Sequence, residues 1–235
     1  MAPYRECLAP SAPQPAILFS AMSPKDEESP ADYNDGGYLQ VKPSDLFKDG
    51  RYTIVRKLGS VLLPLLASAR ANFANFSQLG PLFHRVACQG RPVRPSFLFL
   101  CTLLILYHSE KRHSALKVVK SAGRYSETAR DEIKLLRQIT SASPSHPGRA
   151  HIVSFLDSFT HTVSSTAHIC ISFEPLGVNL LSLIEKNRRK GVPPCVVKNI
   201  TRQVLLGLQY LHEECDLVHT DVKPENISQY HVMLK

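Results

Sequence analysis

The chain has 235 residues, of which 43% are hydrophobic and 20% are charged, so it is long enough to bury a sizeable core in one large or two small domains. Its six cysteines form no Cys-x-x-Cys pair and have no regular spacing, which argues against a disulfide framework or a zinc site and favours a reducing compartment. The formal net charge is +8, but residues 50–109 hold seven basic and no acidic side chains, so the excess comes from one segment. Direct nucleic-acid binding, which needs a basic stripe interleaved with aromatics, is therefore not expected.

The texture of the chain changes at Tyr33. Residues 1–32 are rich in Pro, Ala and Ser and show no sustained apolar period, which predicts a disordered leader. The apolar stretch AILFSAM within them is too short for a signal peptide. Asp35-Gly36-Gly37 is a turn signal, and RYTIVRKLG (residues 51–59) alternates like a strand that ends at its glycine.

Residues 60–109 are unusual for a folded soluble segment because they contain no Asp or Glu. They end in SFLFLCTLLILY, which is shorter than the roughly 20 apolar residues that a membrane-spanning helix needs. We therefore expect a buried or interfacial segment rather than a transmembrane one. A membrane-associated protein anchored through residues 96–107 is the alternative, because basic side chains flank this run on both sides.

Order returns at SALKVVKSA (residues 114–122), which predicts a short strand. The Thr128-x-x-Asp131 spacing then predicts a helix start. The apolar face of that helix would contain Ala129, Ile133, Leu136 and Ile139. Ser and Pro indicate a loop over residues 141–149.

Two strands are expected at residues 151–160 and 167–174, followed by a short helix at 179–191 that ends at its glycine. A strongly amphipathic helix is predicted by the helical spacing of Val197, Ile200, Val204, Leu208 and Leu211. Strands, a helix, strands and two helices in this order indicate an α+β fold, with a small sheet-based lobe before the start of a helical one.

The chemistry-bearing residues gather first in HTDVKPEN, residues 219–226. In phosphoryl transfer an Asp such as Asp221 accepts or orients the proton of the attacking hydroxyl, and a neighbouring Lys such as Lys223 neutralises charge on the transferred group. Asn226 would offer a neutral oxygen to Mg²⁺, which prefers hard oxygen ligands. The alternative is a polar loop after a helix. His219 is expected to be a packed structural residue rather than a base.

Lys117, in the strand ALKVVK, is the second candidate, because a strand lysine can place its ammonium against ATP phosphates. Glu132 lies fifteen positions on, toward the apolar face of the predicted helix, where a carboxylate is costly unless it is paired. We therefore expect an ion pair between the two. In SFEPLG, the backbone groups of Glu174 and Leu176 are candidates to hydrogen-bond an adenine edge.

Together these residues resemble the eukaryotic protein kinases. YNDGGY, DLFKDGRYTIVRKLG, ALKVVKSAGRYSETARDEIKLL, FEPLG and HTD in place of the common HRD resemble the serine/arginine-protein kinases, over residues 33–59 and 113–227. The resemblance implies a kinase N-lobe, an antiparallel sheet with one helix, at 33–59 and 113–176. It also implies a non-family insert at 60–112 and a truncated start of the helical C-lobe at 177–235.

The resemblance further implies transfer of the ATP γ-phosphate to serine in Arg-Ser-rich splicing factors, with Mg²⁺, in the cytoplasm or nucleus. Asp221 would be the catalytic base with Lys223 beside it, and Asn226 would bind the metal. The nucleotide-binding set would contain Leu58, Gly59, Ala115, Lys117, Glu132, Phe173, Glu174 and Leu176. Phe173 would lie behind the adenine, and Thr220 replaces the Arg that in many kinases pairs with a phosphorylated activation loop.

Departures from the family pattern qualify the activity of this chain. Gly59 is followed by Ser-Val-Leu-Leu-Pro, without the second and third glycines that let backbone amides approach phosphates. The next strand is expected to be missing, and no Asp-Phe-Gly or Ala-Pro-Glu occurs. Retained intron sequence would explain residues 60–109 and the tail after Ile227. The hypotheses are a catalytically impaired kinase, a non-catalytic decoy that binds family partners, and the membrane-anchored protein above.

Overall fold

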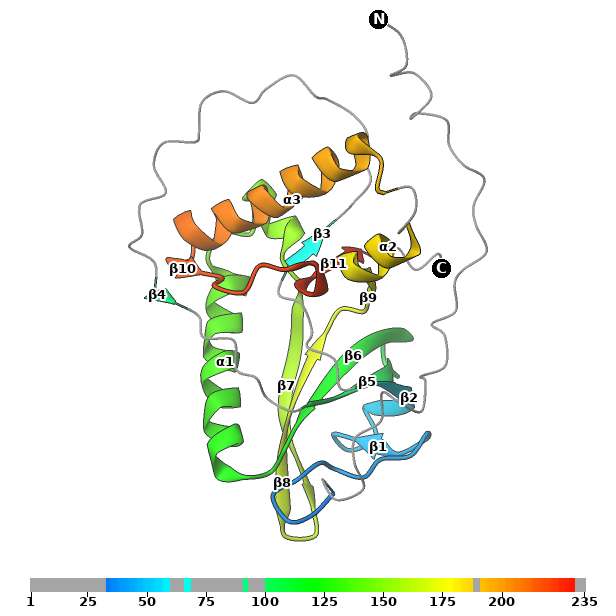
Figure 1. The fold of residues 1–235 in the computed structure, drawn as a ribbon. Helices are drawn as coiled ribbons and strands as arrows, with labels where there is room; N and C mark the ends of the chain where they lie inside the picture. Colours follow the sequence, from blue (N-terminus) through cyan, green and yellow to red (C-terminus); the bar gives the residue numbers. More distant parts are fainter. Residues whose placement is uncertain (1–32, 60–65, 69–90, 93–99, 188–190, 231–235) are drawn as a thin grey trace, which may run out of the picture.

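The computed structural model describes residues 33–59, 66–68, 91–92, 100–187 and 191–230 (Figure 1). The predicted leader, most of residues 60–99 and the last five residues lie outside the described residues. The strands are β1 (Leu46–Phe47), β2 (Tyr52–Gly59), β3 (Leu66–Ser68), β4 (Arg91–Pro92), β5 (Leu100–Tyr107), β6 (Arg112–Val119), β7 (Phe155–Val163), β8 (Thr166–Phe173), β9 (Leu176–Asn179), β10 (Leu217–Val218) and β11 (Ile227–Tyr230). The helices are α1 (Gly123–Ser141), α2 (Leu180–Lys186) and α3 (Pro194–Glu213), with short 3-10 helices η4 (Pro147–His151) and η5 (Pro224–Asn226).

A six-stranded antiparallel sheet in the order β1-β2-β5-β6-β8-β7 forms the N-terminal lobe. Because successive side chains of a strand point to opposite faces, β6 serves two cores. Leu116 and Val118 pack with Tyr38 and other residues of the N-terminal segment, whereas Val119 packs on the opposite face against α1. The structure thus confirms the predicted α+β fold, a small antiparallel sheet with one helix on it and further helices beyond.

The expectation that no strand follows β2 is wrong. Residues 100–107, assigned from the sequence to the non-family insert, form β5 between β2 and β6 in the middle of the sheet. Leu103 and Ile105 are completely buried, and Cys101, Thr102 and Leu104 are also buried, with at most 8% of their surface exposed. A strand covered on both faces has a continuous apolar sequence. Residues 100–107 of the apolar run are therefore a buried strand, while residues 96–99 lie outside the described residues. No helix among the described residues is long and apolar enough to cross a membrane.

Helix α1 begins five residues before the predicted Thr128 start. Thr128 lies inside the helix, where its hydroxyl donates to the Arg124 carbonyl, and the N-cap residue Ala122 makes no side-chain capping bond. The predicted apolar face is correct, since Ala129, Ile133, Leu136 and Ile139 are all buried. The start was mispredicted because tertiary hydrogen bonds from the Ser121 and Ala122 amides, rather than a local capping sequence, hold the residues that lead into the helix.

Helices α2 and α3 were both predicted, but the residues at which they begin and end, or that they bury, differ from the prediction. Helix α2 starts after Asn179, whose side chain accepts a hydrogen bond from the Ser182 amide, and it ends at Lys186 rather than at residue 191. Helix α3 crosses above α1 and the sheet (Figure 1) and packs against η4 and the C-terminal end of α1. Leu211 is completely buried there, but Val197 is 47% exposed, so the buried face of α3 does not include the first residue of the predicted stripe.

Two small sheets flank the loop between β10 and η5. Strand β11 pairs with β9 in antiparallel and with β3 in parallel orientation, and β10 pairs with β4 in parallel. Because β9 follows β8 after only two residues, this pairing ties the end of the large sheet to the segment that follows η5.

Candidate active site

Lys117 and Glu132 form a two-pronged ion pair between β6 and α1. The Lys117 ammonium nitrogen lies 2.5 Å from Glu132 Oε1 and 2.7 Å from Oε2, and the two side chains are 7% and 27% exposed. Lys117 points to the α1 face of the sheet because it is separated from Val119 by two positions along β6. A charge buried this far from water needs a partner, and the carboxylate supplies it.

Gly59 and Lys117 lie in register on either side of Thr102. The Cα partner of Thr102 is Gly59 on β2 and Lys117 on β6, so the end of β2 is two strands away from the ammonium group. Thr102 is 3% exposed and belongs to the same row of the sheet. Thr102 was not predicted as a site residue because it lies in residues 60–112, which were assigned to a non-family insert. Leu58, the residue before Gly59, is half-buried at this end of β2.

Ala115, in the middle of β6, is paired with Phe173, the last residue of β8. These two residues are Cα partners across β6 and β8, and both are buried. The Phe173 ring makes an edge contact with Phe155, their centroids 6.5 Å apart. The predicted nucleotide-binding residues of the sheet therefore occupy adjoining strands, with Phe173 at the point where the chain leaves the sheet.

Glu174 is held by Ser154 through two hydrogen bonds. Its amide donates to the Ser154 carbonyl at 3.0 Å, and its carboxylate accepts from the Ser154 amide at 2.7 Å. Because the Glu174 amide already donates to Ser154, its carbonyl oxygen is the backbone group of Glu174 that is left to accept a hydrogen bond from adenine. Leu176 is 8% exposed at the start of β9, where its Cα partner is Tyr230 of β11.

A cavity of about 500 Å³ lies on another side of this linker. Its walls include Glu174 and Ser154 together with the residues of the loop after α1, among them Arg149. Of the predicted site residues its walls include Glu174 but neither Lys117 nor Asp221, so it does not lie between the ammonium group of Lys117 and the Asp221 carboxylate.

Asp221, Lys223 and Asn226 converge in the loop between β10 and β11. The Lys223 ammonium lies 3.0 Å from Asp221 Oδ2, and Asn226 Nδ2 donates to the same oxygen at 2.9 Å and to the Asp221 carbonyl at 3.0 Å. The hydrogen bond from Lys223 is the main cause of a lowered Asp221 pKa. The loop therefore presents an ionised carboxylate in a fixed orientation, while the buried Asn226 amide keeps its oxygen for another partner.

His219, two residues before Asp221, is buried. Burial lowers its pKa, which keeps the ring neutral at physiological pH, and its Nδ1 accepts the Asp221 amide at 3.3 Å. Thr220, between them, has a positive φ of 61°, and the Asp221 amide also donates to the His219 carbonyl at 2.9 Å. His219 thus holds the backbone of this tight turn at Asp221, in agreement with a structural role for His219.

The large sheet and the loop that carries Asp221 are joined through β9 and β11. Asn226 is the last residue of η5, and β11, which starts at the next residue, pairs with β9 directly after the Glu174 linker. In addition, the Gln138 side chain of α1 donates to the Cys215 carbonyl at 2.7 Å, just before β10. Both ends of the Asp221 loop are thus tied to elements that carry the other predicted site residues, whose roles toward a nucleotide stay predictions.

Comparison with known proteins gives a consistent result. The family described as "Protein kinase domain" matches residues 101–234, a range that begins within β5. The chain is 42% identical over 222 residues to SRSF protein kinase 3 of Sus scrofa, covering 94% of this chain and 33% of that protein. It is 39% identical over 201 residues to Protein kinase dsk1 of Schizosaccharomyces pombe, covering 86% and 30%.

The solved structures agree on the fold. One crystal structure of a kinase domain superposes with a TM-score of 0.58 at 23% identity, covering 83% of this chain and 44% of that one. The chain spans about a third of the length of the curated relatives named above.

Proposed function

This chain belongs to the protein kinase family, and we propose that its site binds ATP with Mg²⁺ and directs the γ-phosphate to serine side chains of Arg-Ser-rich proteins. The similarity to the serine/arginine-protein kinases rests on 94% of the chain. The observation that carries the proposal is the Lys117–Glu132 ion pair. Lys117 is aligned through Thr102 with Gly59 on one side, and on the other side it pairs with β8 two residues before Phe173.

Each polar group fits one part of phosphoryl transfer. The Lys117 ammonium, held by Glu132, is suited to bind nucleotide phosphates, and the carboxylate of Asp221 is suited to orient the attacking hydroxyl. Lys223 lies where it can neutralise charge on the transferred group. The Asn226 amide oxygen and the Asp221 carboxylate are hard oxygen donors, which is the ligand chemistry that Mg²⁺ prefers. When bound, the metal would offset the negative charge of the phosphates.

The preference for Arg-Ser-rich substrates follows from the relatives rather than from a contact in this chain. The relative from Sus scrofa is named an SRSF protein kinase, and the resemblance of YNDGGY and HTD points to the same subgroup. We propose serine in alternating Arg-Ser sequence as the acceptor.

Phosphoryl transfer by this 235-residue polypeptide is proposed to be slow. The sequence Ser60-Val61-Leu62-Leu63-Pro64 after β2 has no glycine, and branched side chains with a proline prevent the close approach of backbone amides to phosphates. Lys117 and the linker strand are unaffected by this change, so nucleotide binding is expected to persist more than turnover does.

Two measurements on the purified chain test the proposal. Binding of a fluorescent ATP analogue with Mg²⁺ is expected for the unchanged chain and is expected to be lost in Lys117→Met, whereas Lys134→Met, on the exposed face of α1, should bind normally. Transfer of labelled phosphate to an Arg-Ser repeat peptide should be weak, absent with a Lys-Ala peptide and abolished in Asp221→Ala. Absence of nucleotide binding by the unchanged chain would overturn the proposal. Retention of an Arg-Ser-rich protein without any transfer would favour the decoy reading.

A further inference from the structure

The N-terminal segment Tyr33–Leu39 contacts the junction between β6 and α1. The Ser121 amide donates to the Gly37 carbonyl at 3.2 Å, and the Ala122 amide donates to the Gly36 carbonyl at 3.1 Å. Ala122 is the N-cap residue of α1 and has no side-chain capping bond of its own. The backbone of the N-terminal segment therefore holds the two residues that lead into α1.

Aromatic contacts attach the same segment to two lysines of the sheet. Lys120 is 8% exposed, and its ammonium lies 4.2 Å from the centroid of the Tyr38 ring. Tyr33 contacts Lys57 of β2, whose ammonium lies 3.0 Å from the Tyr33 hydroxyl. The Tyr33 and Tyr38 rings are 5.8 Å apart. Cation–π contacts with a desolvated ammonium are the stronger kind, so the Tyr38–Lys120 contact favours one position of the segment.

Gly36 makes the turn possible. Its φ is +83°, a left-handed conformation that L side chains rarely adopt, and its carbonyl is the acceptor for the Ala122 amide. A side chain at this position would strain the turn and displace that carbonyl. Gly36 thus fixes the direction from which the segment reaches α1.

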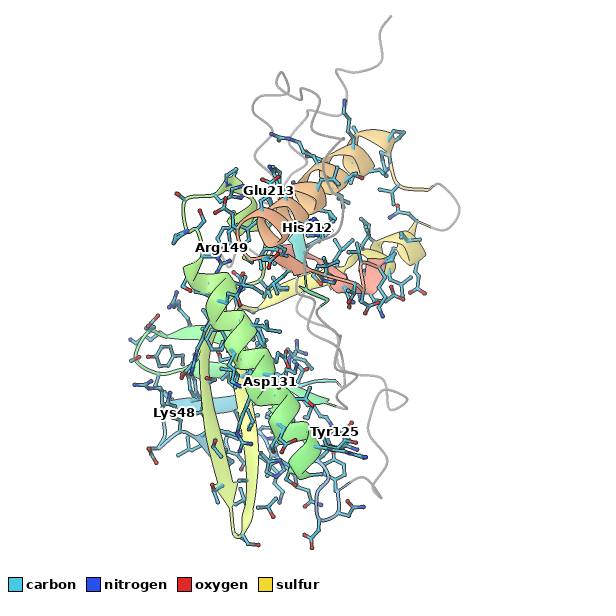
Figure 2. The ribbon with its side chains drawn as sticks, turned by 90° about the vertical axis from the view of Figure 1, so that its left-hand side faces the viewer. Lys48, Tyr125, Asp131, Arg149, His212 and Glu213 are labelled. Carbon is cyan, nitrogen blue, oxygen red and sulfur yellow. The ribbon has the colours of Figure 1, made fainter. Side chains whose placement is uncertain are left out.

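The opposite end of α1 is anchored independently. Gln138 donates to the Cys215 carbonyl, and the Tyr210 hydroxyl donates to the Ile139 carbonyl, so α3 and the segment before β10 hold this end. Figure 2 shows Tyr125 at the first turn of α1, Asp131 near its middle and Arg149 close to its far end. Glu132 therefore lies between two anchors, and the distance from its carboxylate to Lys117 depends on both.

We propose that the segment Tyr33–Leu39, through Gly36 and Tyr38, positions α1 so that Glu132 meets Lys117. These are positioning residues, because they lie on the sheet face opposite Lys117 or at the start of α1 and act through the helix. The inference rests on the proposed function only for its effect on nucleotide affinity. The Lys117–Glu132 contact itself can be measured without nucleotide, from the NMR signal of the Lys117 ammonium group.

The test uses the full chain with Tyr38→Leu, which removes the ring, and Tyr38→Phe, which keeps it. In ¹⁵N-labelled protein the buried Lys117 ammonium should give a slowly exchanging ¹H–¹⁵N signal that persists in Tyr38→Phe and is lost in Tyr38→Leu. Gly36→Ala is the second variant, since it leaves the core unchanged, and it should lose the signal as well. Persistence of the signal in both Tyr38→Leu and Gly36→Ala would overturn the inference.

Nucleotide binding separates positioning from general destabilisation. Tyr38→Leu should raise the Kd of the ATP analogue about fivefold, which is less than the roughly 30-fold effect of one fully desolvated cation–π contact because the anchor at the other end of α1 remains. In a Glu132→Gln background the same substitution should have no further effect, because the group through which it acts is gone. An equal effect in both backgrounds would show a merely structural role and would overturn the inference. If the unchanged chain binds no nucleotide, the proposed function fails, and the ammonium signal alone decides the positioning role.

Discussion

Replacing Glu132 by Gln tests the ion pair that dominates the site. Gln keeps the length of the side chain and one carbonyl acceptor but removes the negative charge. The Lys117 ammonium, only 7% exposed, then stays buried beside a neutral amide. Removing one partner of a buried ion pair is much more costly than never having had the pair, because the remaining charge is left uncompensated.

The expected loss of stability is moderate rather than maximal. Complete breakage of a buried pair typically costs about 3–5 kcal/mol. Glu132 is 27% exposed, so water screens part of its charge, and the Gln carbonyl recovers one hydrogen bond. We therefore expect a loss of about 2–3 kcal/mol in the free energy of unfolding, which lowers the melting temperature by about 5–10 °C for a chain of this size.

The control comes from the same helix. Asp131 and Lys134 form an ion pair of 2.8 Å with side chains 71% and 76% exposed, and Figure 2 shows Asp131 on α1 beside this exposed face. Asp131→Asn should change stability by less than about 0.5 kcal/mol. Urea unfolding followed by circular dichroism measures both variants at pH 7. Equal stability losses for Glu132→Gln and Asp131→Asn would refute the argument that burial makes the Lys117 pair special.

Three further substitutions follow from single contacts. Gly148→Ala should leave little folded protein, because its Cβ would lie 2.0 Å from a backbone oxygen of α3; normal expression and melting temperature would contradict this. Lys223→Met should raise the lowered Asp221 pKa toward its ordinary value, so stability is lost at a higher pH as the solution is acidified, and an unchanged carboxyl ¹³C titration would refute it. Tyr52→Phe should lower the free energy of unfolding by about 1.5–3 kcal/mol, because it removes a hydrogen bond to a charged group. Burial raises the Asp157 pKa, but the hydrogen bonds from Lys48 and Tyr52 outweigh this effect and keep the carboxylate ionised, so the loss of one of them leaves that charge less well satisfied. A change below about 0.5 kcal/mol in urea unfolding would show that the Tyr52 bond contributes little.

The elements that were predictable from the sequence are those whose pattern is local. The buried face of helix α1 was predictable because Ala129, Ile133 and Leu136 recur at helical spacing, a pattern that indicates an amphipathic helix. Strands β7 and β8 were also predicted, although β7 begins at Phe155 rather than at residue 151 and continues to Val163. The pairing of Lys117 with Glu132 was also expected from one local fact, a carboxylate near an apolar helix face.

What the sequence could not supply depends on contacts between distant segments. The start of α1 is set by hydrogen bonds from backbone amides at residues 121 and 122 to the carbonyls of Gly37 and Gly36, some 85 residues earlier. Thr128 does not cap the helix. Likewise, the end of the Glu174 linker is fixed by Ser154 and by the pairing of β9 with β11. The charge pattern of residues 60–109 concealed β5, since an acid-free segment was interpreted as one unit although its last residues belong to the sheet.

Strand β5 and the segment before it differ in how strictly their sequence is constrained. A central strand requires apolar side chains in register on two faces, and LCTLLILY satisfies this although it was not recognised as a family sequence. A phosphate-binding turn instead requires backbone amides at particular positions without side chains in the way, and Ser60-Val61-Leu62-Leu63-Pro64 does not meet that requirement. The sheet forms with Thr102 between Gly59 and Lys117, whereas the sequence after Gly59 does not have the further glycines of a phosphate-binding turn. Because the two segments differ in this way, we expect the chain to fold and to bind nucleotide, and we propose that the sequence after Gly59 affects phosphoryl transfer more than either of these.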